Sequence, residues 1–176
     1  MKLVYLLLLV GFCYSAQAET KVSFSKTADV RHYKTYQWLA PRLFTQSGIY
    51  EEDARFAPVV RKVFDEGLAA RGYVRVAEGG ELQLLTAATA VKSSQLEGFL
   101  VMYGFDSFSG YYGPMTASPV TRINREGVLV VALYDPKTKT NVWSGYDTQG
   151  LGKPGSEGGA VNKAAGKLLK KLPKRN

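Results

Sequence analysis

The chain has 176 residues, with 23 lysines and arginines against 15 aspartates and glutamates. A single cysteine excludes an internal disulfide, and one histidine argues against a zinc site of the usual histidine and cysteine type. The length fits one domain with a real core. The positive charge either favours anionic partners, such as lipid head groups, cell-wall polymers and acidic proteins, or serves solubility alone.

Residues 1–18 have the pattern of a secretory signal peptide. Lys2 supplies the positive charge of the N-terminal region, and Leu3–Phe12 is the apolar region that follows. Ala16–Ala18 is a cleavage site of the small-x-small type. The apolar run is shorter than the about 20 residues that a membrane-spanning helix needs. We therefore expect cleavage after Ala18 and export of residues 19–176. Export removes the protein from most nucleic acid, so no nucleic-acid partner is expected.

Cys13 offers an alternative fate for the N-terminus, because it resembles the lipidated cysteine of a bacterial lipoprotein. Lipoprotein processing normally requires a small residue directly before the cysteine, and Phe12 occupies that position. Lipidation at Cys13 is therefore disfavoured relative to cleavage after Ala18.

Three elements are predicted in the first half of the exported chain. Residues 20–25 alternate between apolar and polar side chains, which is typical of a half-buried strand. Residues 33–39 are rich in Tyr, Thr and Trp and predict a second strand, which Pro41 ends. A helix is predicted from about Ala57 to Arg71, and Gly72 is placed to adopt the left-handed conformation after it.

A strand over 81–91 is followed by a segment of different character. Residues 93–119 combine frequent glycine with aromatic side chains, so they predict a long irregular loop. Exposed aromatics on such a loop can stack on sugars, insert into lipid or bind a protein. Alternatively, they fold back over the sheet and complete the core. The candidate binding surface comprises Phe99, Tyr103, Phe105, Phe108, Tyr111 and Tyr112.

The strongest structural pattern is a β-hairpin within residues 125–146. Val128–Tyr134 is an unbroken apolar run of strand length, Asp135-Pro136 suits a type I turn, and Asn141–Tyr146 returns. Alternate residues of the first strand point to opposite faces, and both sets are apolar. Two helices on one side of the sheet would leave the other side in need of a cover.

The last predicted element is a helix over 161–172 with one apolar stripe. Its lysines either complement the helix dipole at the surface of a packed helix or contact anionic lipid head groups. The lysines in question are Lys163, Lys167, Lys170 and Lys171. Together the elements predict a single α+β domain with a largely antiparallel sheet of about five strands and two helices packed on one face.

Few residues carry recognisable catalytic chemistry. His32 has no evident partner to orient it as a base, and Asp65 and Glu66 are adjacent, as expected for a solvated helix face. Residues 150–155 match the dinucleotide pattern G-x-G-x-x-G, but Pro154 removes an N–H and no strand follows. We therefore predict no catalytic residues, no metal site and no cofactor.

Several short segments are informative when they are taken in order along the chain. They are Thr20–Phe24, Ala28-Asp29, Tyr33–Leu39, Leu68–Tyr73, the Gly/Tyr-rich loop, Arg125–Gly127, Val142–Gly145 and Lys167–Pro173. Together they resemble the exported bacterial proteins grouped as domain of unknown function 4136. The resemblance implies a small α/β domain of the Gram-negative envelope, often lipid-anchored at the outer membrane, with no established activity or catalytic residues.

We therefore expect a non-catalytic protein of the periplasm or outer membrane that binds a protein partner or another envelope component. Two alternatives remain open. A hydrolase acting on cell-wall or glycan substrates would show a cleft with converging polar groups, for example Asp106 with His32. A lipid carrier would show an apolar cavity beneath the aromatic loop.

Overall fold

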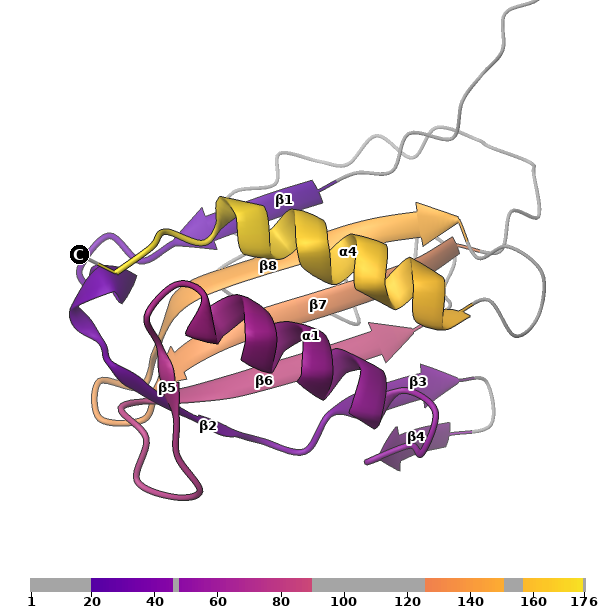
Figure 1. Ribbon diagram of the computed structural model, residues 1–176, viewed down its shortest axis with the longest axis horizontal. Helices are drawn as coiled ribbons and strands as arrows, with labels where there is room; N and C mark the ends of the chain where they lie inside the picture. The colour runs from indigo at the N-terminus through magenta and orange to yellow at the C-terminus, as the bar shows by residue number, and fades with distance from the viewer. Residues whose placement is uncertain (1–19, 46–47, 90–125, 151–156, 176) are drawn as a thin grey trace, which may run out of the picture.

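The structure is a computed structural model that describes residues 20–45, 48–89, 126–150 and 157–175 (Figure 1). These residues form one α+β domain with a single sheet and two α-helices. The strands are β1 (Thr20–Phe24), β2 (Thr35–Trp38), β3 (Arg42–Thr45), β4 (Gly48–Glu51), β5 (Val74–Arg75), β6 (Leu82–Thr89), β7 (Glu126–Asp135) and β8 (Thr140–Gly150). The helices are α1 (Ala57–Ala69) and α4 (Glu157–Lys171), and a 3₁₀ turn, η1, spans Val30–His32.

The eight-stranded sheet is mixed, with β1, β8, β7, β6, β2 and β5 as neighbours in that order. The β1–β8, β8–β7 and β7–β6 pairs are antiparallel. Strand β6 pairs in parallel with β2 along its first part and with β3 along its last part. Beyond β6, strand β5 pairs with β2 and strand β4 pairs with β3. The edge of the sheet opposite β1 is therefore formed by two strands, β5 and β4.

Both helices lie on one face of this sheet (Figure 1). Beneath them, β7 contributes Leu129, Val131 and Leu133 to the main core, and Trp143 of β8 lies opposite Leu133. The helices complete this core with the apolar stripes that the sequence predicted. The buried helix residues are Val60, Phe64 and Leu68 of α1 and Ala164, Ala165, Leu168, Leu169 and Leu172, from α4 and the residue after it.

The other face of β7 is apolar and buried as well. Val128, Val130 and Ala132 alternate with the core residues and are at most 4% exposed, and Tyr146 of β8 lies opposite Val130. No described helix packs against this face. Both apolar faces of the first hairpin strand are therefore buried. The loop 93–119, expected to serve as this cover or as a binding surface, lies outside the described residues.

The sequence located most of the elements correctly. The helix that starts at Ala57, the hairpin and the left-handed Gly72 (φ 86°) are all confirmed. Four features differ from expectation. The sheet has eight strands instead of about five, and it includes parallel pairs. Helix α4 begins a turn early at Glu157, and β3 and β4 form a hairpin that was not predicted. The dipeptide Ser47-Gly48, between two β-prone runs, could have indicated that hairpin.

Helix α4 approaches the sheet closely because β8 carries a glycine at the contact. A methyl group on Gly145 would lie 2.8 Å from a methyl carbon of Leu168 and 3.1 Å from the backbone oxygen of Lys21. The absence of a side chain therefore sets how deeply Leu168 seats against the sheet, because close-packed interiors tolerate extra volume poorly.

We expect Gly145→Ala to lower the free energy of unfolding by about 1–3 kcal/mol, because the added methyl group overfills the contact. Urea denaturation followed by circular dichroism measures this change. Gly166→Ala is the matched control, since no atom lies within 4 Å of its added methyl group. That variant should gain up to about 1 kcal/mol of helix stability. Equal effects of the two substitutions would contradict the packing argument.

Candidate functional site

The candidate residues proposed from the sequence fall into two groups. The six aromatic residues of the loop 93–119, together with Cys13 and Asp106, lie outside the described residues. The four lysines of α4 and His32 are described. Lys163, Lys170 and Lys171 are exposed, whereas Lys167 forms an ion pair, and His32 lies on η1.

An open hollow of about 780 Å³ lies where β1 passes into η1, and we call it the β1–η1 hollow. It is lined by residues 24–33 together with Thr138 of the β7–β8 turn and Pro173 of the C-terminal tail. Phe24 contributes an unusually exposed aromatic side chain, 49% accessible to solvent. The hollow therefore combines an apolar contact surface with the polar rim of η1.

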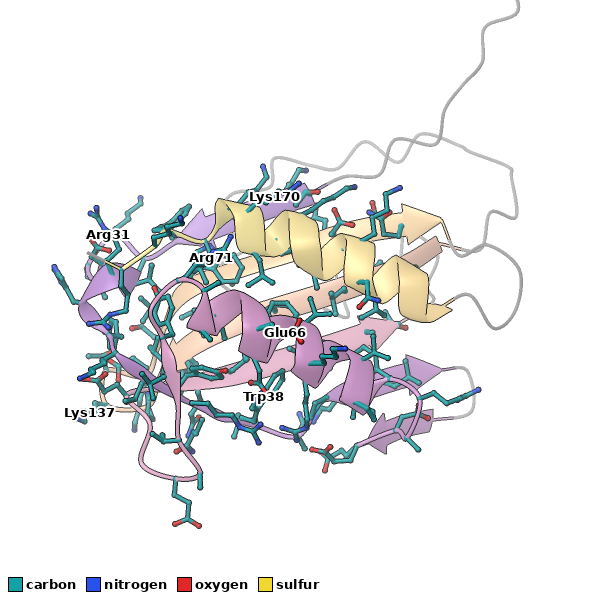
Figure 2. All side chains as sticks on the ribbon, viewed as in Figure 1. Arg31, Trp38, Glu66, Arg71, Lys137 and Lys170 are labelled. Atoms are coloured by element: carbon teal, nitrogen blue, oxygen red, sulfur yellow. The ribbon has the colours of Figure 1, made fainter. Side chains whose placement is uncertain are left out.

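The rim of the β1–η1 hollow is positively charged and locally ordered. Arg31 donates two hydrogen bonds from Nε (2.9 Å) and Nη2 (2.6 Å) to Oδ2 of Asp29. These bonds, together with the one from the Arg31 backbone N–H, hold the pKa of Asp29 at about 2. Lys26 and His32 also line the hollow. Figure 2 places Arg31 at the end of the domain that carries η1.

A buried carboxylate, Asp135, joins two segments that line the hollow, at Tyr33 and Thr138. Asp135 accepts hydrogen bonds from the Tyr33 hydroxyl at 2.9 Å and from the backbone N–H of Lys137 at 2.8 Å and of Thr138 at 3.3 Å. Burial alone would raise the pKa of Asp135, but these donors more than offset it and the pKa is lowered. Burial, with the bond to Asp135, raises the pKa of Tyr33 to about 12. The hairpin turn is thereby fastened to the η1 segment.

His32 does not form a catalytic arrangement with its described neighbours. It lies on the rim of the hollow, and no described side chain hydrogen-bonds to its ring. A general base needs a partner that orients it, so the described part of the site offers no dyad for hydrolysis. Among the described residues, no three histidine, cysteine or acidic side chains gather closely enough to hold a metal ion.

Strand β1 borders the hollow and forms an open edge of the sheet. It pairs with β8, and no described strand pairs with its other side. The N–H of Ser25 donates to Val142 O at 2.9 Å, so alternation along the strand turns the N–H and C=O groups of Val22 and Phe24 away from β8. The main chain of this edge is therefore available to pair with another strand, next to the exposed Phe24.

A second polar cluster joins α1 to β2. Oδ1 of Asp65 accepts hydrogen bonds from the Tyr36 hydroxyl at 2.6 Å and from Trp38 Nε1 at 2.8 Å, and its Oδ2 pairs with Arg75 at 2.9 Å. Burial, together with the bond to Asp65, raises the pKa of Tyr36. The guanidinium of Arg61 lies over the Trp38 ring, 4.9 Å from its centroid.

The sequence prediction for the acidic pair on α1 is correct for one residue only. The expectation that Asp65 belongs to a solvated helix face is wrong, because its carboxylate binds Tyr36 and Trp38. Its neighbour Glu66 is exposed, as expected (Figure 2).

A third cluster ties the start of β1 to α4. Asp147 of β8 has a fully buried side chain that accepts hydrogen bonds from Thr20 and Gln149. Lys167 of α4 reaches the same carboxylate at 3.4 Å. Sequence reasoning did not find this cluster, since its members are far apart in the chain and each is unremarkable alone.

None of the described helices is long and apolar enough to cross a membrane.

Comparison with known proteins identifies the family. Residues 20–174 match the family described as Domain of unknown function (DUF4136). The chain belongs to this family. The match confirms the resemblance found in the sequence and spans all the described strands and helices. A comparison with curated proteins found no match.

Three solved structures share the fold. A DUF4136 family protein from Bacteroides thetaiotaomicron has 14% identity and a TM-score of 0.57, and the alignment covers 90% of this chain and 98% of that one. A PelC dodecamer from Paraburkholderia phytofirmans has 13% identity and a TM-score of 0.53, covering 91% and 100%. A variant PelC dodecamer from the same organism has 16% identity and a TM-score of 0.52, also covering 91% and 100%. At these identities the similarity establishes the fold alone.

We expect Asp65→Ala to lower the free energy of unfolding by about 2–4 kcal/mol, because it leaves the hydroxyl of Tyr36 and the indole N–H of Trp38 without their acceptor. Glu66→Ala is the neighbouring control and should change stability by less than about 0.5 kcal/mol. Urea denaturation of both variants measures the difference. Similar stabilities would show that the Asp65 cluster does not hold α1 to β2.

A second prediction concerns pH. Because the folded pKa of Asp135 is lowered, its stabilising contribution is present above the unfolded value of about 3.9 and is lost as the pH falls through the folded pKa. Asp135→Asn should be less stable at pH 7 and should lose less stability between pH 7 and pH 3 than the wild type. Urea denaturation at both pH values tests this, with the exposed Glu78→Gln as control. An unchanged pH dependence in Asp135→Asn would refute the assignment.

Proposed function

We propose that this chain is a non-catalytic protein of the cell envelope that binds a protein partner along the β1 edge and in the β1–η1 hollow. The observation that carries the proposal is the open edge of β1, which ends at the exposed Phe24 on the border of the hollow. Of the two large apolar side chains exposed among the described residues, Phe24 and Val74, only Phe24 lines the hollow.

The edge and the hollow suit an extended peptide segment. A strand added beside β1 would exchange main-chain hydrogen bonds with Val22 and Phe24, and this exchange would supply affinity. A side chain of that strand would pack on Phe24 in the hollow, which would supply specificity. Lys26 at the rim favours a segment that carries negative charge nearby, since Arg31 is already paired with Asp29.

A second copy of this chain is the first partner to consider. The solved PelC structures that share the fold are dodecamers, so this architecture supports self-association in at least one protein. An open strand edge is a surface through which identical subunits associate without changing their fold. The envelope location rests on the secretory pattern of residues 1–18.

We expect the chain from Glu19 onward to self-associate in sedimentation velocity, and Phe24→Glu to shift it towards the monomer by at least tenfold in dissociation constant. The substitution would remove the apolar contact of Phe24 and would require a carboxylate to be desolvated at the interface. Val74→Glu is the matched control, because Val74 is 48% exposed on the opposite edge strand β5. Circular dichroism melting checks that both variants fold.

Photo-crosslinking in the native envelope tests partners other than a second copy. A benzophenone amino acid at position 24 should give a discrete cross-linked species, identified by mass spectrometry, that the same probe at position 74 does not give. The proposal would be refuted by a monomeric wild type together with no specific cross-link at position 24.

A further inference from the structure

We infer that the outer surface of α4 is a docking face for a membrane that contains anionic lipids. The face consists of Lys163, Lys170, Lys171 and Lys174, and we call it the lysine face. All four residues are exposed. This surface is separate from the β1–η1 hollow, so the inference does not depend on the proposed protein partner.

The geometry of α4 gathers these lysines on one side. Positions 163, 170 and 171 of α4 are two helical turns apart to within one residue, and they lie away from the stripe that packs on the sheet. Lys174 follows in the tail after the end of α4. From Lys163 to Lys171 the array extends about 12 Å at 1.5 Å per residue. Figure 2 shows Lys170 projecting from the side of the domain that carries β1. A linear array without a cavity fits an extended charged surface better than a small anion.

The lysine face is free of compensating acids among the described residues. Five described surface acids are neutralised by arginines: Asp29 by Arg31, Glu51 by Arg42, Glu52 by Arg61, Asp53 by Arg55 and Asp65 by Arg75. Lys167 is the one α4 lysine with a described ion pair, to the buried Asp147. The four lysines of the lysine face have no described acidic partner. Lys163, Lys170, Lys171 and Lys174 therefore form a surface whose positive charge no described ion pair offsets.

The composition of the lysine face favours a membrane as the occupant over an acidic protein. Stable protein interfaces depend on buried apolar or aromatic anchors, and the leucines of α4 are already buried in the main core. A surface that offers lysines alone fits the charged plane of an anionic bilayer.

The contact is electrostatic and does not involve insertion of the helix. Leu168, Leu169 and Leu172 are at most 6% exposed because they pack in the main core, so α4 has no apolar face to offer lipid. Lysines near an anionic surface each strengthen binding by about fivefold, and salt screens the attraction within about 10 Å at 0.1 M.

The test is co-sedimentation of the chain from Glu19 onward with vesicles, which removes any contribution from the apolar run. The wild type should bind vesicles with 30% phosphatidylglycerol, should not bind pure phosphatidylcholine, and should be released by 0.5 M NaCl. Lys163→Gln/Lys170→Gln/Lys171→Gln should weaken binding by roughly 100-fold, at about fivefold per lysine. Lys62→Gln/Lys137→Gln/Lys139→Gln changes the net charge equally on other exposed surfaces and should weaken binding by less than threefold.

Three results would overturn the inference. They are failure of the wild type to bind anionic vesicles, equal binding to neutral vesicles, and equal losses in the two triple variants. Binding to soluble polyglutamate but not to anionic vesicles would assign the lysine face to an acidic polypeptide instead. Thermal melting of both triple variants confirms that they remain folded.

Discussion

The close seating of α4 on β8 is the constraint on which the rest of the structure depends. Leu168 fits against the sheet because Gly145 leaves room for it, and Leu169 in the same way occupies the space above Gly67 of α1. These two contacts hold sheet and helices together as one packed unit. They also fix which side of α4 faces outward, so the position of the lysines follows from the placement of two glycines.

The hairpin and both helices were predictable because each is specified by local periodicity. The apolar run from Val128 and the stripe of α4 need no knowledge of the rest of the chain. The parallel pairing of β6 was not predictable in the same way. Its partners β2 and β3 precede it by tens of residues, and nothing in their side chains indicates strand direction. The β3–β4 hairpin is short, and its turn signal is weak compared with that of Asp135-Pro136.

The carboxylates show most clearly why the site could only partly be predicted. Asp65, Asp135 and Asp147 each bind a residue from another part of the chain, at separations of 29, 102 and 127 positions for Tyr36, Tyr33 and Thr20. Spacing rules cover neighbours on one helix or strand and do not reach such pairs. The exposed lysines of α4, in contrast, follow directly from helical periodicity. The hollow beside Phe24 exists only because the hairpin turn, η1 and the C-terminal tail meet there.

The pairing of β1 with β8 has a consequence for how the protein folds. Thr20 and Asp147 are 127 residues apart, so the loop that their contact closes is among the longest that this chain can form. Closing so long a loop has a high entropic cost, which is offset only once the intervening sheet is in place. We therefore expect strand β1 to join the sheet late, after β6, β7 and β8 have paired. In that order of assembly, the exposed edge of the sheet is β8 until β1 docks, and the β1 edge forms only when the rest of the domain has folded.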